Sequence, residues 1–139
     1  MPEAVDLTEV GRHDCLRLLA RGVVGRVVFS AGALPAAQPV TYVLDRGEVI
    51  YHAAIGSTLA TATQRAVVGF EADDIDRDTL TGWSVLGVGQ TYQVTDPVRL
   101  AGLAHAPAWD LTGRSLTIAI RLQRLTGRLR DPAAVVLRP

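Results

Sequence analysis

Hydrophobic and polar residues alternate in several short stretches, and this period of two is typical of half-buried β-strands. The pattern predicts strands over residues 25–30, 38–44, 48–53, 67–72, 82–94 and 116–122, the last slipping at 123–125 before it resumes. Asp45-Arg46-Gly47 predicts a tight turn between the second and third of these strands. Gly87 and Gly89 interrupt the fifth strand, which indicates a bulge or a close approach of another backbone.

Three short helices are expected among these strands, over residues 9–21, 57–64 and 97–104. Gly22 is a plausible stop for the first, Ser57 a cap for the second, and Asp96 with Pro97 a start for the third. The acidic run 73–78 is expected to be a solvated loop. Because most strands lack a following long helix, the order excludes a doubly wound α/β sheet. It predicts a mainly β, closed or nearly closed six-stranded antiparallel barrel.

Length and composition narrow the class of protein. The 139 residues suffice for one domain, 1–139, of which residues 1–7 are expected to be mobile. Fourteen basic residues balance fourteen acidic ones, so no net field favours nucleic acid or an anionic membrane surface. No apolar run approaches the roughly 20 residues of a membrane helix. The single cysteine, Cys15, excludes an internal disulfide and indicates a reducing, cytoplasmic compartment.

Few residues carry chemistry by their own pattern. There is no lysine, which excludes a Schiff-base mechanism. Cys15 lies among leucines and is interpreted as a core residue in preference to a reactive thiol. His13 and His105 have no partner at metal-ligand spacing, so no metal site is predicted.

An ordered set of segments carries a resemblance: GRVVFS, PVTYVLDRGEVIYHA, GSTLATA, VGFEADDID, TGWSVLGVGQTYQVTDP and TGRLR. In this order and spacing they resemble the pyridoxamine 5′-phosphate oxidase-like flavin-binding split-barrel family, in its small actinobacterial branch, from about residue 7 to residue 129. The resemblance implies a six-stranded split barrel that forms a homodimer with two cofactor sites along the subunit interface. The usual cofactor of the family is FMN, and some branches bind a deazaflavin coenzyme.

The resemblance also implies a cofactor site. Val40, Thr41 and Tyr42 would lie beside the flavin ring, and Gly56-Ser57 would meet the phosphate. Thr58 stands where the family has a lysine, and residues 87–90 carry no charge where an arginine is usual. Each charged hydrogen bond contributes about 1.5–3 kcal/mol, so losing two predicts FMN binding weaker by roughly two to four powers of ten. Possible replacement cations are Arg65, Arg124 and Arg128.

Several of these residues have two possible interpretations. Tyr42 is either a barrel aromatic with an exposed hydroxyl or a contact at the flavin edge, and His52 is packed or solvated more often than catalytic. Trp83, with Ser84 beside it, is either interface core or a border of the cofactor bound by the other subunit. Trp109 is a dimer anchor or a lid aromatic. The predicted cofactor-binding set is Val40, Thr41, Tyr42, His52, Gly56, Ser57, Thr58, Leu59, Trp83 and Ser84.

The main hypothesis is a cytoplasmic, homodimeric, FMN-dependent oxidoreductase acting on a small organic substrate at the flavin face. One alternative is a non-catalytic split barrel that binds flavin, haem, another planar ligand or none. A further alternative is a deazaflavin-dependent reductase, whose longer acidic cofactor would need a basic channel. Oxidation of pyridoxamine 5′-phosphate itself is not expected, because the chain is short and lacks both phosphate-binding cations.

Overall fold

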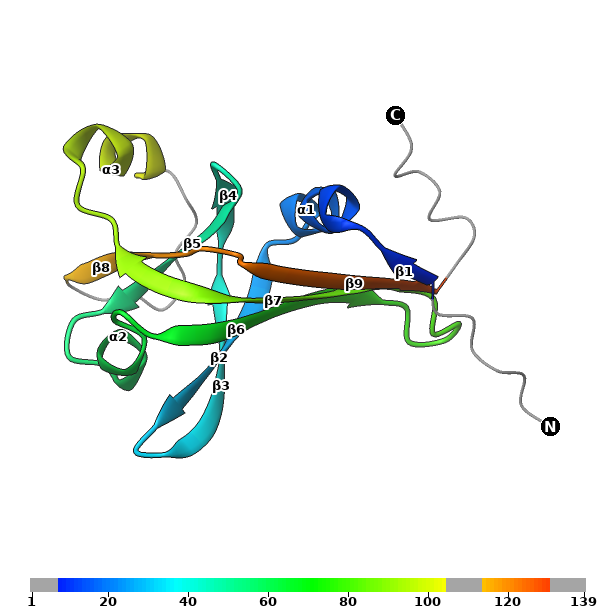
Figure 1. The fold of residues 1–139 in the computed structure, drawn as a ribbon, viewed down its shortest axis with the longest axis horizontal. Coiled ribbons are helices and arrows are strands. Elements are labelled where there is room, and N and C mark those ends of the chain that lie inside the picture. The colour runs from blue at the N-terminus through cyan, green and yellow to red at the C-terminus, as the bar shows by residue number, and fades with distance from the viewer. Residues whose placement is uncertain (1–7, 105–113, 131–139) are drawn as a thin grey trace.

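The computed structural model describes residues 8–104 and 114–130, which form one curled antiparallel sheet with three short helices (Figure 1). The strands are β1 (Thr8–Val10), β2 (Val24–Ala31), β3 (Leu34–Thr41), β4 (Val43–Asp45), β5 (Glu48–Ala54), β6 (Val67–Ile75), β7 (Gly82–Gln93), β8 (Ser115–Ile120) and β9 (Arg124–Arg130). The helices are α1 (Arg12–Arg21), α2 (Thr58–Ala62) and α3 (Pro97–Leu103). Predictions for residues 1–7 and for His105 and Trp109 fall outside the described residues.

The sheet curls so far that its first and last strands, β3 and β4, are two halves of one bent strand. Its strand order is β3-β2-β6-β7-β8-β5-β4, with β9 beside β7 and β1 beside β9. The two ends of this order, β3 and β4, follow one another in the chain, with Tyr42 alone between them. β7 is the longest strand and borders β6 along one edge and β9 and then β8 along the other. The predicted mainly β split barrel is therefore confirmed.

The described residues form nine strands, not the predicted six, and the difference has a physical cause. β3 and β4 are halves of one bent strand, and β8 and β9 are halves of another, broken at 121–123 where the sequence pattern slips. Counting each pair once leaves six long strands and β1. β1 corrects the helix predicted over 9–21: residues 8–10 pair with β9, so α1 begins only at Arg12. The predicted strand 38–44 likewise starts earlier, at Leu34.

The acidic run also departs from its prediction as a loop. Asp73 and Asp74 belong to β6, where they pair with Ser84 and Trp83 of β7. The length of β7 provides a hydrogen-bonding partner for these residues, and ladder bonds outweigh the weak strand preference of aspartate. The turn begins only at Asp76, whose carboxylate accepts bonds from two backbone N–H groups of the turn, both at 2.9 Å.

The main core lies on the inner side of the curl, where alternate residues of the long strands meet. Tyr51, Phe70 and Val85 are at most 1% exposed. Helix α1 adds Cys15 and two leucines to the same cluster, so the prediction that Cys15 is a core residue is confirmed. A smaller cluster on the other side of β5 and β8 is covered by α3 through Leu103. Among the described helices, none is long and apolar enough to cross a membrane.

Tyr42 fixes the bend that joins β3 to β4. Its hydroxyl donates a 2.6 Å hydrogen bond to the carbonyl oxygen of Leu19 in α1, and its ring packs edge-on against Phe70 at 4.8 Å. Gly22 makes room for this contact, since a Cβ there would lie 2.3 Å from the hydroxyl oxygen. Gly25 does the same for Phe70, whose ring tip would lie 2.2 Å from a Cβ. The end of α1 and the bend of the sheet are thus held together by one aromatic pair.

Candidate functional site

An open groove of about 360 Å³ lies between the β2–β3 turn and α2. In Figure 1 these two elements lie at the same end of the molecule, away from the β6–β7 turn. The groove is lined by Ser30, Ala31, Gly32, Gly56, Thr58, Thr61 and Ala62. Three of these residues carry a hydroxyl group, and none carries a charge.

The local chain geometry builds the α2 side of this groove. Gly56 has φ +85°, a left-handed conformation that glycine adopts without strain. Ser57 then caps α2, because its Oγ accepts a 3.1 Å bond from the backbone N–H of Ala60. The predicted cap is therefore confirmed, although α2 spans 58–62 where 57–64 was expected. The left-handed Gly56 and the Ser57 cap together turn the chain from β5 into the wall of the groove.

The predicted cofactor-binding residues 56–59, of which 56–58 were expected at the phosphate, divide into two groups. Gly56 and Thr58 line the groove. The Ser57 hydroxyl faces its own helix as the cap, and the Leu59 side chain is 3% exposed within the main core. A cofactor contact by Leu59 stays a prediction for its backbone atoms.

The predicted ring-binding segment, 40–42, lies at the other end of the β2–β3 hairpin. Val40 pairs with Gly25, whereas the groove residue Ala31 pairs with Leu34. Six residues of strand separate the two places, or about 20 Å. Val40 and Tyr42 are buried, and burial raises the pKa of the Tyr42 hydroxyl to about 12. Tyr42 is a barrel aromatic, as one reading proposed, but its hydroxyl is not exposed.

His52 lies in β5 opposite Thr117 of β8. Its Nδ1 is 3.1 Å from the Thr117 hydroxyl oxygen, and partial burial lowers the pKa of the imidazole. This burial favours the uncharged form of the ring. No group of three or more histidine, cysteine or carboxylate side chains that could hold a metal ion occurs in the part of the chain that the structure describes.

Trp83 and Ser84 border a second, much smaller hollow of about 70 Å³, beside the β6–β7 turn. Trp83 is 7% exposed and belongs to the main core, while Arg128 and Arg130 of β9 complete the hollow. The groove lies near the opposite end of the same strands, because Trp83 pairs with Asp74 whereas Val67 begins β6. Seven residues of β6, about 23 Å, separate these positions. One chain therefore does not bring the predicted site residues together.

The arginines named as replacement cations do not line the groove. Arg124 and Arg128 lie on β9, and Arg65 follows the far end of α2. The backbone of Arg114 lies beside the start of this wall, since its carbonyl oxygen accepts a 3.1 Å bond from the N–H of Ile55, but its side chain is not part of the described lining. Thr58 is thus not compensated by a neighbouring arginine in the groove wall.

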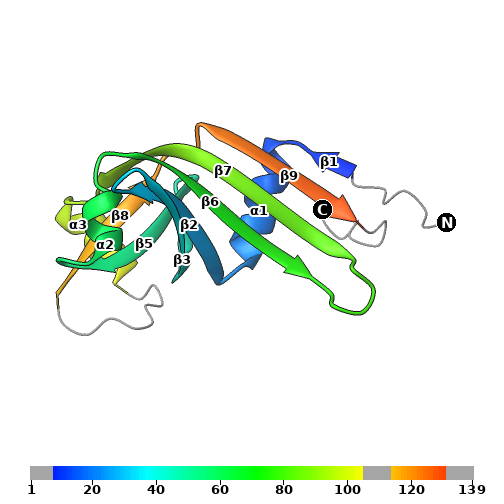
Figure 2. The same cartoon turned by 90° about the horizontal axis from the view of Figure 1, so that it is seen from below.

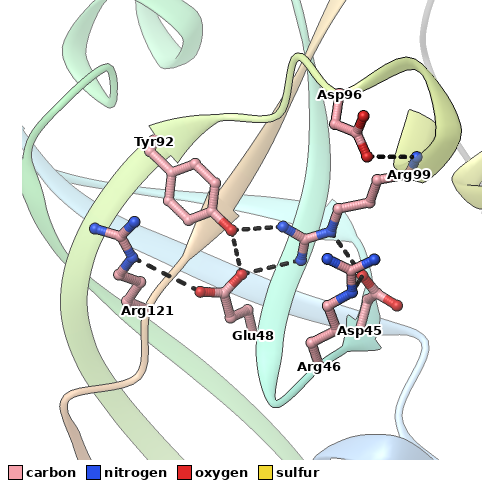
Figure 3. Close-up of polar contacts among 7 residues, drawn as sticks. All are labelled: Asp45, Arg46, Glu48, Tyr92, Asp96, Arg99 and Arg121. Carbon is pink, nitrogen blue, oxygen red and sulfur yellow. Dashed lines mark hydrogen bonds and ion pairs between the residues drawn. The ribbon is translucent and has the colours of Figure 1, made fainter.

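An arginine whose side chain is only 9% exposed has a different role. Arg99 of α3 contacts Asp45 at 2.8 Å and Glu48 at 2.9 Å, and Figure 3 shows it enclosed by these carboxylates and Tyr92. The Tyr92 hydroxyl donates to Glu48, and Arg121 lies 4.5 Å from the centre of the Tyr92 ring. This polar cluster attaches α3 to the β4–β5 turn. Sequence reasoning missed it because its members are about 50 residues apart and share no spacing motif.

The sequence and the fold are similar to those of known proteins. The family model described as pyridoxamine 5′-phosphate oxidase matches residues 11–129. The uncharacterized protein Rv0080 of Mycobacterium tuberculosis is 35% identical over 132 residues, covering 89% of this chain and 86% of that protein.

Solved structures agree with this match. A FAD binding protein from Mycobacterium smegmatis has a TM-score of 0.76 and 29% identity, covering 88% of this chain and 100% of that one. A putative pyridoxamine 5′-phosphate oxidase from Corynebacterium glutamicum has a TM-score of 0.75 and 23% identity, covering 88% and 96%. The second of these likenesses shows the fold alone.

Proposed function

Because the chain belongs to the pyridoxamine 5′-phosphate oxidase family, we propose that it is a flavin-binding oxidoreductase that acts on a small organic substrate. FMN is the form of the cofactor that the family resemblance implies. The observation that carries the proposal is the groove between the β2–β3 turn and α2. Its volume lies within the range of small-molecule sites, and Gly56 and Thr58 border it where the resemblance predicts the flavin tail.

The lining residues fit the hydroxylated chain of a flavin but not its phosphate. The hydroxyls of Ser30, Thr58 and Thr61 suit the polyhydroxyl chain that joins the flavin ring to its phosphate. The residues of the lining that the structure describes offer no charged group for the phosphate itself. A bound flavin would supply hydride transfer, while the chain would hold and orient it and shield it from water.

The direct test is the absorbance and fluorescence of the purified protein, followed by titration with FMN, FAD, riboflavin and a deazaflavin coenzyme. We expect uptake of a flavin with quenched fluorescence, and reduction of the bound flavin by a reduced nicotinamide donor. A protein that is colourless and takes up none of these compounds would contradict the proposal. A deazaflavin with an acidic tail is expected to bind least, since the groove wall has no cation.

The second candidate is a non-catalytic binding protein on the same scaffold, favoured by the absence of charge in the groove wall. It predicts that flavin or another planar ligand binds but is not reduced by any nicotinamide donor. Single-turnover reduction of the bound flavin under anaerobic conditions separates the two candidates.

We also propose that the chain forms a homodimer. What supports this, besides the family, is the outer face of β2, β6, β7 and β9; Figure 2 shows β6 and β7 crossing in front of α1. On this face Val28, Ile75 and Leu86 are 39–50% exposed, although they lie within the sheet. β6 adds carboxylates and β9 adds arginines, so two copies would bring apolar and opposite-charge groups together.

A further inference from the structure

We infer that the groove between the β2–β3 turn and α2 takes the uncharged form of the flavin, riboflavin, at least as well as the phosphorylated forms FMN and FAD. This inference rests on the proposed flavin-binding function and names the ligand class of the same site. It departs from the phosphate-bearing cofactor that the family resemblance implies. Three observations carry it.

The first observation is the chemistry of the groove wall. All seven lining residues are uncharged, and four of them are glycine or alanine. A phosphate monoester carries a charge of about −1.5 to −2 at pH 7. Moving such a group from water to a wall without cations loses hydration without providing charged hydrogen bonds in exchange. The described wall therefore disfavours the charge of the phosphate.

The second observation is that two arginines are paired elsewhere and that one position of β7 has no room for a side chain. Arg99 is held between Asp45 and Glu48, and Arg26 pairs with Glu71 at 3.0 Å on the outer face of the sheet. Gly89, within the stretch where the family has an arginine, lies against the carbonyl group of Arg121 and leaves no space for a side chain. None of these three positions places a charge in the described wall of the groove.

The third observation is which polar groups of the groove are already hydrogen-bonded within the protein. The Ser57 hydroxyl already accepts the Ala60 N–H as the cap, and α2 has five residues. By contrast, Ser30, Thr58 and Thr61 present hydroxyls in the lining, and hydroxyl groups both donate and accept hydrogen bonds. A sugar-alcohol chain offers the same chemistry, so these residues match the part of the flavin that all three forms share.

The test compares the dissociation constants of riboflavin and FMN by fluorescence quenching, on the full chain at pH 7.5. For the wild type we expect riboflavin to bind as tightly as FMN or more tightly. Thr58→Lys restores the cation that the family has, and it should strengthen FMN binding at least tenfold while changing riboflavin binding less than threefold. Val98→Lys, on the exposed face of α3, adds the same charge away from the groove and should change neither constant.

Arg114→Gln tests an arginine whose backbone is bonded to Ile55, next to the groove, and should leave the ratio of the two constants unchanged. FMN binding more than threefold tighter than riboflavin in the wild type would overturn the inference while leaving flavin binding intact. A Thr58→Lys protein with no gain in FMN affinity would also overturn it, because Thr58 would then not face the phosphate position. Failure of every flavin to bind would contradict the proposed function itself. Circular dichroism of each variant shows whether it folds.

Discussion

Gly89 of β7 lies directly against Arg121, in the break between β8 and β9: a Cβ on Gly89 would stand 1.4 Å from the Arg121 carbonyl oxygen. Two backbone bonds hold the break in place, from Arg121 to Gln90 at 3.0 Å and from Gln123 to Val88 at 3.0 Å. The close backbone approach predicted from the two glycines of this strand is therefore confirmed at Gly89. The bend that lets one strand serve as both β8 and β9 depends on a missing side chain.

Gly89→Ala should destabilise the protein strongly, because backbone atoms and not a flexible side chain occupy the space. We expect a loss of at least about 2 kcal/mol in the free energy of unfolding, measured by urea denaturation. Gly102→Ala is the matched control, since nothing lies within 4 Å of its Cβ position in α3. That variant should gain about 0.5–1 kcal/mol from helix propensity. Equal midpoints for the two variants would contradict the close approach.

Tyr42→Phe separates a structural role from a cofactor contact. Removing the hydroxyl leaves the Leu19 carbonyl oxygen without its 2.6 Å partner, which should cost about 1 kcal/mol of stability. Flavin affinity should stay within twofold of the wild type, because the hydroxyl is buried against α1. A large loss of affinity at unchanged stability would instead restore the predicted flavin contact.

Arg99→Met tests the cluster that attaches α3. The Arg99 side chain is 9% exposed, and its removal leaves the partly buried carboxylates of Asp45 and Glu48 without this cation. The expected loss is about 2–4 kcal/mol, since breaking one side of a buried pair leaves an uncompensated charge. Arg121→Met is the control: this side chain is 58% exposed, and its loss should cost less than about 1 kcal/mol. Similar losses for both would show that Arg99 is not the centre of the cluster.

Glu71→Gln should change how stability depends on pH. Burial, followed by the neighbouring Asp73, raises the pKa of Glu71 from 4.5 to about 7 despite its pair with Arg26. The folded state therefore binds this proton more tightly than the unfolded state, and the stability it contributes is lost as pH rises from 4.5 to 7. Between pH 4.5 and 7 the urea midpoint of Glu71→Gln should rise relative to that of the wild type. Above pH 7 the difference between the two midpoints should stay constant. A constant difference at all pH values would refute the raised pKa.

Leu86→Arg tests the proposed homodimer. An arginine at the centre of the outer face would be buried next to its own copy, so we expect a monomer by sedimentation velocity where the wild type is a dimer. Val98→Arg replaces an equally apolar, 79% exposed side chain on α3 and should leave the dimer unchanged. A Leu86→Arg protein that stays dimeric would place the contact on another surface.

The sequence predicted the long strands well because their signal is local. Alternation located the strands, and the caps at Ser57 and Asp96 lie where short polar side chains precede the helices. It missed β1 and the extension of β6 to Ile75, because both exist only through partners far along the chain, β9 and β7. Pairing partners at that separation leave no mark in the local pattern.

The candidate site was predictable in part. Gly56 and Thr58 line the groove as their place after the hairpin suggested, but Ser30 and Thr61 entered it without any sequence signal. Val40, Tyr42 and Leu59 carry strong family likeness and yet place their side chains in the core. A sequence motif indicates which residues lie near a site. Within a strand, successive side chains point to opposite faces, so only some of these residues turn their side chains toward the site.

The edge strand β3 has a consequence for how the protein behaves when concentrated. Its register with β2 leaves the other side of β3 unpaired among the described strands, and such an edge invites strands of other molecules. Pro35 and Pro39 both lie in this strand and have no N–H to donate. The two prolines are four residues apart, so the N–H groups that they lack would point to the same edge of β3. The other edge of β3 carries the hydrogen bonds to β2. The two prolines therefore protect the split barrel against intermolecular sheet growth and aggregation.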